Sequence, residues 1–228
     1  MKKHYIVTKS NSLIHSKYDL SLEEQRILLS IASLVQPEDE HFKTYQMSVS
    51  EFANLTNVEV DSKYSKLRRI TKKLMSRVLE IEDSQRFYQL HWLSSCTYIK
   101  GQGIIELRIS DELKPYMLQL KERFTTYHLS NILKMQSKYS IRMYEIMKAH
   151  QYQKEFKIDI DVLKTILKCE SYKQWSHIRT RVIEPSVKEI NYYTDLLIDY
   201  KPIKTGRSIS TLEFTVKDNI SDGELYGS

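Results

Sequence analysis

The sequence predicts an α+β fold, mostly helical, in which two tandem domains repeat one order of elements. Three observations predict it. Apolar residues at spacings of three and four, the period of an amphipathic helix, recur along both halves of the chain. Each half then closes with two strand-like segments around a glycine-containing turn. The length of 228 residues suffices for two domains of roughly 100 residues, each able to bury a core.

In the first half, a helix is expected to begin after Ser21. The Ser21 side chain can cap it, and Glu24 three residues later completes a capping box. Two more helices follow, and then two strands around a tight turn that holds Gly101 and Gly103. The expected ranges are 50–55 and 62–81 for these helices, and 87–100 and 104–110 for the strands.

The second half repeats this order of elements. Three helices are expected, each marked by apolar residues on one face. Two strands follow around a turn that contains Gly206. The expected ranges are 137–150, 159–168 and 171–193 for the helices, and 196–203 and 208–216 for the strands.

Individual residues also correspond between the two halves. Ser21 and Arg26 match Ser137 and Arg142 at the same five-residue spacing. Three apolar residues match at a constant separation of 109 positions. They are Leu74, Val78 and Ile81, with Ile183, Val187 and Ile190 as their counterparts. We therefore predict internal duplication; a chance similarity of amphipathic helices is the alternative.

Three helices followed by a two-stranded hairpin form the winged helix-turn-helix plan. Its third helix enters the major groove of DNA, and its hairpin lies along the phosphate backbone. The prediction is thus two tandem winged helix-turn-helix domains related by internal duplication, with a bridging helix over residues 111–124. The expected boundaries are 1–124 for the first domain, 125–220 for the second, and 221–228 for a short C-terminal tail.

The expected third helix of the second domain has an apolar face and, opposite to it, a polar face. The polar side chains are of types that hydrogen-bond base edges, and an arginine among them can bind guanine through two hydrogen bonds. A solvated helix face is the alternative, as for most charged patterns of this kind. The predicted base-reading residues are Lys173, Gln174, His177, Thr180 and Arg181.

Two residues depart from this pattern. Arg179 lies toward the apolar sector when residues are placed at 100° intervals, so we expect it to reach either a phosphate or a core carboxylate. Pro185 interrupts the helix because it lacks a backbone N–H, so the predicted faces apply only before it.

Other basic residues are expected to bind phosphate without reading sequence. Residues 62–79 hold seven basic residues and no acidic one, and such charges repel one another unless an anionic partner binds. The start of the helix over 137–150 also favours a phosphate, through the helix dipole and an exposed basic stripe. A solvated edge is the alternative in both places. The predicted phosphate-binding residues are Ser137, Lys138, Arg142, Arg179, Lys204, Arg207, Lys66, Arg69, Lys73 and Arg77.

Composition and missing motifs narrow the function. A net charge of +6 and a pI of about 9.0 fit a polyanionic partner. No run approaches the ~18 apolar residues of a membrane span, and the N-terminal residues lack the apolar core of a signal peptide, so no membrane partner is expected. The two cysteines are far apart in sequence and form no CxxC motif, which is typical of the cytoplasm. The chain has no GxxxxGK[ST] motif and no HxH pair, so we expect no cofactor, no metal site and no enzymatic activity.

These residues resemble the Rep family of iteron-binding plasmid replication initiators, proteins with two winged-helix domains. The resemblance runs from about His4 to Asp218. Its most specific stretches are SLEEQRILLSIA, PYMLQLKERFTTYHLSNILKMQSKYSIRMYEIMK and RVIEPSVKEINYYTDLLIDYKPIKTGRSISTLEFTV.

The resemblance implies that the second domain reads direct repeats in double-stranded DNA at a plasmid origin. It implies that the first domain contributes dimerisation and accessory DNA contacts, within a monomer–dimer equilibrium. Recruitment of host initiator and helicase proteins, repression of the protein's own gene by the dimer, and a bacterial cytoplasmic location are also implied. A winged-helix transcriptional repressor is the first alternative. A rolling-circle nicking enzyme, which would cleave single strands with a divalent metal, is the second.

Overall fold

Two units with the same sheet topology make up the structure. It is a computed structural model, and it describes residues 5–36, 39–56, 63–82 and 84–219. The first unit is Met1–Leu133 and the second is Lys134–Ser228. In both, the last strand of a three-stranded antiparallel sheet lies between the other two. The predicted α+β fold with two winged-helix domains is confirmed.

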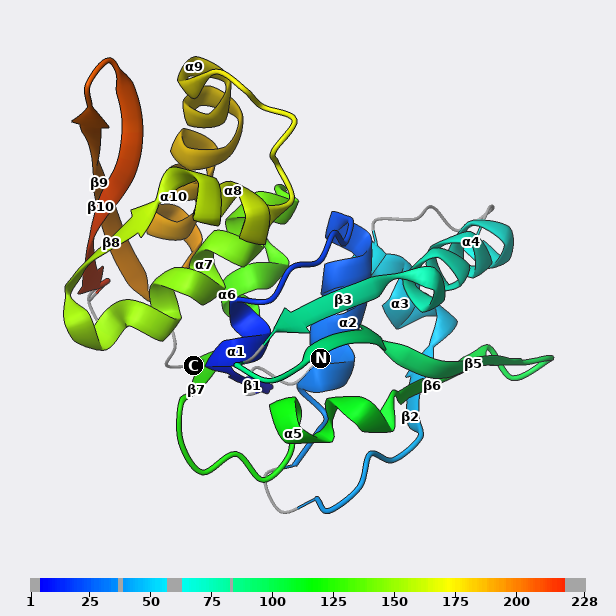
Figure 1. The fold of residues 1–228 in the computed structure, drawn as a ribbon. Helices are drawn as coiled ribbons and strands as arrows, with labels where there is room; N and C mark the ends of the chain where they lie inside the picture. The colour runs from blue at the N-terminus through cyan, green and yellow to red at the C-terminus, as the bar shows by residue number, and fades with distance from the viewer. Residues whose placement is uncertain (1–4, 37–38, 57–62, 83, 220–228) are drawn as a thin grey trace. The chain divides into compact units, whose positions relative to one another are not determined.

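The first unit combines a small helical core with three antiparallel sheets (Figure 1). Its winged-helix sheet has the order β2-β6-β5, and α4 packs against β5. The elements are β1 (Ile6–Ser10), α1 (Asn11–Ile14), α2 (Leu22–Ala32), β2 (Tyr45–Ser48), α3 (Val49–Thr56), α4 (Lys63–Ser76), β3 (Val78–Glu82), β4 (Phe87–His91), β5 (Leu93–Ile99), β6 (Ile104–Ile109), a 3₁₀ turn (Asp111–Leu113), α5 (Lys114–Met117), β7 (Phe124–His128) and α6 (Ser130–Leu133).

The predicted capping box at Ser21 is present. The Ser21 hydroxyl oxygen accepts a hydrogen bond from the Glu24 backbone N–H at 3.2 Å, and the Glu24 carboxylate accepts one from the Ser21 N–H at 2.7 Å. Two N–H groups that α2 itself leaves unsatisfied are thereby paired, which fixes where the helix begins.

The long helix predicted over 62–81 ends earlier, at Ser76. Residues 78–82 instead form β3, which pairs with β4. Leu79 and Ile81 are buried while Val78 is exposed, which is the alternation of a strand. Short apolar runs fit both the helical and the strand period, and only the pairing with a partner strand decides between helix and strand. The predicted first residue of this helix, Ser62, lies outside the described residues.

Two further predictions for the first unit are wrong. The strand expected over 87–100 is divided into β4 and β5 at Trp92, whose side chain is fully buried. The bridging helix expected over 111–124 stops at Met117, and Gln119 and Arg123 after it have positive φ angles.

The boundary between the units also differs from the predicted one at residue 124. β7 pairs antiparallel with β1, so the segment after residue 124 belongs to the first unit, which extends to Leu133. Neither β1 nor β7 was predicted from the sequence. Residues 221–228, the predicted tail, lie outside the described residues.

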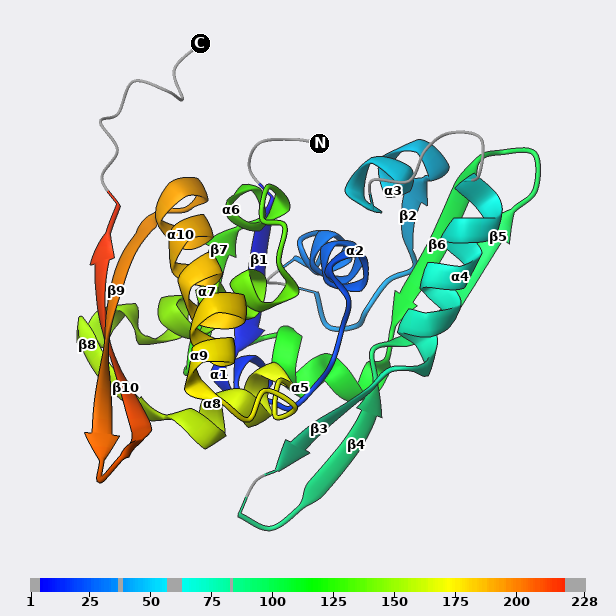
Figure 2. The ribbon, with the colours of Figure 1, turned by 90° about the horizontal axis from the view of Figure 1, so that it is seen from above.

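In the second unit, α7, α9 and α10 lie on one side of the sheet β8-β10-β9 (Figure 2). The three predicted helices and two predicted strands are present, and β8 is added to them. The elements are α7 (Lys138–His150), a 3₁₀ turn (Gln151–Gln153), β8 (Glu155–Asp159), α8 (Ile160–Leu167), α9 (Trp175–Ile178), a π-helical segment (Arg179–Ile183), α10 (Glu184–Tyr193), β9 (Leu196–Thr205) and β10 (Ser208–Asp218).

The residue correspondence between the two units holds only in part. Ser21 and Ser137 are both N-caps, and Arg26 and Arg142 are both buried in the helix that follows. The match of Val78 and Ile81 to Val187 and Ile190 fails, because the first two lie in a strand and the others in a helix. The shared plan is therefore one of topology.

Among the described residues, no helix has both the length and the apolar composition needed to cross a membrane.

Candidate nucleic-acid interface

One long helix of the second unit presents the residues expected to read bases. It runs without interruption from Trp175 to Tyr193 through α9, the π-helical segment and α10, and we call it the third helix. Its inner side buries Ile178 and Val182. The five predicted base-reading residues are all exposed, on this helix or directly before it: Lys173, Gln174, His177, Thr180 and Arg181.

Contacts within the helix region hold two of these side chains. The Arg181 guanidinium carbon lies 5.6 Å from the centroid of the Tyr172 ring. The Thr180 hydroxyl donates a hydrogen bond to the Ser176 carbonyl oxygen at 2.8 Å. A cation–π contact at an exposed site contributes about 0.5–1 kcal/mol, enough to restrict the orientation of Arg181 without occupying its N–H donors.

The third helix changes its hydrogen-bond pattern next to Pro185. The Glu184 backbone N–H donates to the carbonyl oxygen of Arg179, five residues earlier, instead of four. Proline has no N–H, and its ring would clash with the carbonyl oxygen four residues before it in a regular α-helix. The predicted interruption at Pro185 is thus a π turn inside a continuous helix.

The π turn also decides the environment of Arg179. This side chain is about half exposed, and its Nε lies 3.5 Å from a Glu184 carboxylate oxygen. The expectation that Arg179 reaches a core carboxylate is wrong, because Glu184 is itself half exposed. Residues five apart face each other across a π turn, whereas a regular α-helix would separate them.

The wing lies beside the third helix (Figure 1). β9 and β10 form its hairpin, and the turn between them begins at Gly206, whose φ of 62° favours glycine. Lys204 and Arg207 at the tip are both exposed, as their predicted phosphate-binding role requires. The rings of Trp175 and Tyr200 are in edge contact at 6.5 Å, which joins the start of the third helix to the wing.

The N-terminus of α7 differs from the prediction. Arg142 is buried, with 3% of its surface exposed, and its Nη1 lies 3.2 Å from a carboxylate oxygen of the fully buried Glu145. Arg142 therefore cannot reach a DNA phosphate. The exposed basic stripe was wrongly predicted, because α7 is buried on the side that carries Arg142 as well as on its apolar side.

A carboxylate already occupies the place expected for a phosphate at this helix end. The backbone N–H groups of Gln136 and Ser137 donate to the two carboxylate oxygens of Glu189, at 3.0 and 3.3 Å. The Ser137 hydroxyl oxygen accepts from the Tyr139 N–H at 3.1 Å. Lys138, half-buried, has its Nζ 5.0 Å from the centroid of the Tyr139 ring. These contacts argue against Ser137 as a phosphate ligand.

In the first unit, α4 holds most of the basic residues predicted to bind phosphate. Arg69 and Lys73 are exposed and Lys66 is half-buried. Arg77 lies after the helix, and its Nε is 3.1 Å from an oxygen of the buried Glu24 carboxylate. The expectation that all seven charges lack an acidic partner is therefore wrong for Arg77, because Glu24, distant in sequence, folds against it.

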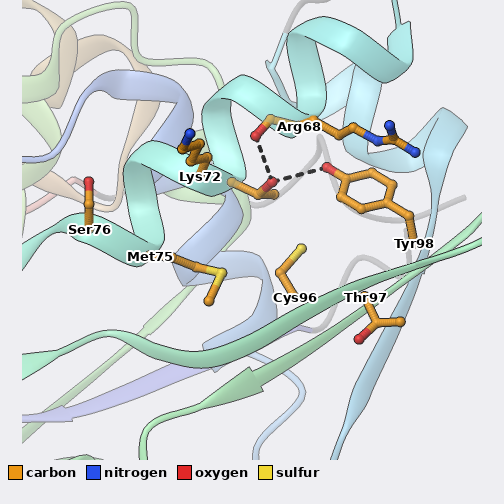
Figure 3. Close-up of a pocket in the computed structure, with 8 residues that line it drawn as sticks. Arg68, Lys72, Met75, Ser76, Cys96, Thr97 and Tyr98 are labelled. Carbon is orange, nitrogen blue, oxygen red and sulfur yellow. Dashed lines mark hydrogen bonds between the residues drawn. The ribbon is translucent and has the colours of Figure 1, made fainter.

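A groove between α4 and β5 holds two further basic residues of α4 (Figure 3). Arg68 and Lys72 line it, and the Arg68 guanidinium carbon lies 5.5 Å from the centroid of the Tyr98 ring. The hydroxyl groups of Tyr98 and Thr71 are 3.1 Å apart, a hydrogen bond that ties α4 to the sheet. Burial raises the pKa of Tyr98 to about 12, so this phenol keeps its proton.

Arg68 and Lys72 belong to the basic run of residues 62–79, but neither was predicted as a site residue. Both fall outside the stripe of Lys66, Arg69 and Lys73 on a helical projection. The aromatic residue opposite Arg68 comes from a strand about thirty positions later, so no local signal could have linked them.

Comparison with known proteins identifies the family. Residues 6–148 match the family described as initiator replication protein, WH1, and residues 159–216 match the one described as initiator Rep protein, WH2. The chain belongs to the initiator replication protein family. The first match covers the first unit and extends into α7 of the second, and the second match covers residues from β8 to β10 of this initiator.

Relatives and a solved structure resemble this initiator over most of its length. A replication initiation protein of Escherichia coli is 29% identical over 226 residues, which cover 93% of this chain and 69% of that protein. The PI protein of Escherichia coli is 22% identical, covering 90% and 80%. The crystal structure of Pi initiator protein in complex with iteron DNA matches with a TM-score of 0.75 and 19% identity, covering 96% of this chain and 100% of that one. This likeness supports the fold.

Proposed function

We propose that this protein starts plasmid replication by binding repeated sequences, iterons, in the double-stranded DNA of an origin. The observation that carries the proposal is the third helix, which is anchored on its inner side. Five polar side chains, on this helix or directly before it, are exposed beside a basic wing tip. Membership of the initiator family and the iteron complex of the Pi protein support it.

The proposed roles follow from position. The five exposed residues of the third helix region read base edges in the major groove, with Arg181 suited to guanine and Gln174 to adenine. Lys204 and Arg207 bind phosphates along the backbone beside the groove. Arg69, Lys73 and Lys66 on α4 bind further phosphates through the first unit.

Footprinting on the DNA that flanks the gene of this protein tests the proposal. We expect protection of several direct repeats of one sequence, spaced by whole helical turns. Protection of a single short palindrome would favour the alternative function, a winged-helix transcriptional repressor. The absence of any protected site would contradict sequence-specific DNA binding.

We further propose that the protein acts by binding and has no catalytic activity, since the family's proteins are initiators and the chain holds no recognised catalytic motif. A rolling-circle nicking enzyme would cut one strand of origin DNA when a divalent metal is supplied. Incubation of supercoiled origin plasmid with the protein and Mg²⁺ or Mn²⁺ should leave it supercoiled, and nicked circles would contradict the proposal.

The remaining partners belong to the same proposal. Origin opening by a protein without a motor requires recruitment of host initiator and helicase proteins in the bacterial cytoplasm. A monomer–dimer equilibrium through the first unit would separate initiation by monomers from repression of the gene by dimers. Sedimentation of the full chain and of the second unit alone tests this, because only the full chain should dimerise.

A further inference from the structure

The third helix contains one more residue in its central turn than a continuous α-helix would. On the basis of the function proposed above, we propose that Pro185 is a positioning residue for DNA recognition. It fixes the π turn at Arg179–Ile183, and this turn sets the direction in which residues 173–181 face the DNA. Pro185 itself is half-buried, and it does not belong to the base-reading face.

The core contacts of the helix show the shift directly. Two adjacent residues, Val182 and Ile183, are both fully buried. Before them the buried position is Ile178, four residues earlier, and after them the buried positions are Ser186 and Ile190, at steps of three and four. Val182 thus continues the inner stripe of the N-terminal half, and Ile183 begins the inner stripe of the C-terminal half.

A regular α-helix would change which residue faces the core. Counting back from Ile190 through Ser186 and Ile183 at helical spacing, the next inward position is Arg179. The π turn places Ile178 there instead and leaves Arg179 half exposed, beside Glu184. Each residue of register corresponds to about 100° of rotation, so losing the π turn would turn Arg181 and its neighbours away from their present direction.

The C-terminal half of the helix is held firmly, so the N-terminal half is the part that would move. Glu189 accepts hydrogen bonds from two backbone N–H groups at the start of α7. The Asn191 side chain donates to the carbonyl oxygen of Ile198 at 2.9 Å and accepts from its N–H at 2.7 Å. The N-terminal half packs on the core through Ile178 and Val182, and it is joined to the wing by the ring contact of Trp175 with Tyr200.

Two variants of the full chain test the proposal. Pro185→Ala restores the N–H and removes the ring, which allows a regular α-helix. Pro185→Ala combined with deletion of Ile183 also removes the extra residue, so that Ile178, Val182, Ser186 and Ile190 form one α-helical stripe. Pro115→Ala is the matched control, because Pro115 also lies in the first turn of a helix but follows no π segment.

The measurement is the ratio of dissociation constants for a scrambled duplex and for a duplex that carries the footprinted repeats. Pro185→Ala should lower this ratio by about tenfold or more, the size of one lost bidentate base contact, while binding to the scrambled duplex stays within about twofold. The combined variant should recover most of the ratio, because its base-reading face points again in the original direction. Pro115→Ala should match the wild type.

Each other outcome is decisive. A Pro185→Ala protein that is folded by circular dichroism and keeps the wild-type ratio overturns the proposal. If Pro185→Ala does not fold, a combined variant that folds and discriminates supports the proposal. A combined variant that is unfolded or does not discriminate then overturns it. If the wild-type protein prefers no repeat at all, the proposed function fails, and the positioning role fails with it.

Discussion

Single residues of the second unit are expected to act on DNA in two distinguishable ways. Arg181 is exposed in the middle of the third helix, and Lys204 is exposed at the wing tip. Arg181→Ala should cost about 1–3 kcal/mol of binding free energy for the repeats and relax the preference at one base position. Lys204→Ala should weaken binding to all sequences alike. It should also lower the salt slope, the slope of log binding constant against log salt concentration, by about one.

Competition binding with repeat and scrambled duplexes separates the two effects. If Arg181→Ala reduces binding to both duplexes equally, the third helix does not read bases.

Arg142 is expected to matter for folding and not for DNA contact. Its guanidinium lies beside the Glu145 carboxylate, and both side chains are almost fully buried. Removing one partner of a buried ion pair commonly costs about 3–5 kcal/mol, so Arg142→Ala should lower the free energy of unfolding by roughly that amount. Urea denaturation measures the free energy of unfolding. Lys138→Ala is the control, because Lys138 is only half-buried. A changed salt slope of DNA binding with unchanged stability would restore the phosphate role.

The two cysteines should differ in reactivity, since both are free thiols but only Cys96 is partly exposed. Burial, with a smaller contribution from Glu170, raises the pKa of Cys169 to about 11, and burial also raises that of Cys96. A raised pKa lowers the thiolate fraction at pH 8. In the Cys96→Ser variant, Cys169 should therefore react with a disulfide reagent only after unfolding in guanidinium. Fast reaction of the native variant would contradict the burial of this thiol.

At the scale of elements, α4 is expected to supply charge without sequence preference. Arg69 and Lys73 are exposed on it, and the Thr71–Tyr98 hydrogen bond holds the helix on β5. The Arg69→Ala/Lys73→Ala double variant should lower the salt slope by about two and leave the discrimination between repeat and scrambled DNA unchanged. Lys121→Ala, which removes an exposed charge outside α4, is the control. Equal slopes for all three proteins would exclude α4 from the interface.

Some features of the elements depend on neighbouring residues in the sequence, and others depend on tertiary packing. The N-caps at Ser21 and Ser137 lie where the sequence predicts them, because a cap needs only residues two or three positions away. β3 was predicted as the end of a helix, because its apolar residues also fit the helical period and only the pairing with β4 distinguishes the strand. The π turn could be located at Pro185 from the sequence, but not its hydrogen-bond pattern, which depends on two apolar stripes packing against one core.

At the scale of the whole molecule, binding should depend strongly on salt. The net charge is +6, and exposed basic residues occur on α4, on the third helix and at the wing tip. With about 6–10 phosphate contacts, affinity should fall by about 10³–10⁵-fold between 50 and 200 mM salt. Fluorescence anisotropy with a labelled duplex over this range measures the slope. A flat response would exclude DNA as the partner.

The sequence by itself determined the order of helices and wings, the N-caps, and which side of the third helix is polar. These features depend on periodicity and on contacts a few residues apart. Only the tertiary structure decided that Arg142 and Arg77 each pair with a carboxylate, and that Arg68 lies against Tyr98. A basic side chain looks the same in the sequence whether it meets a buried carboxylate or a phosphate. Which of them it meets is set by the segments that folding brings beside it.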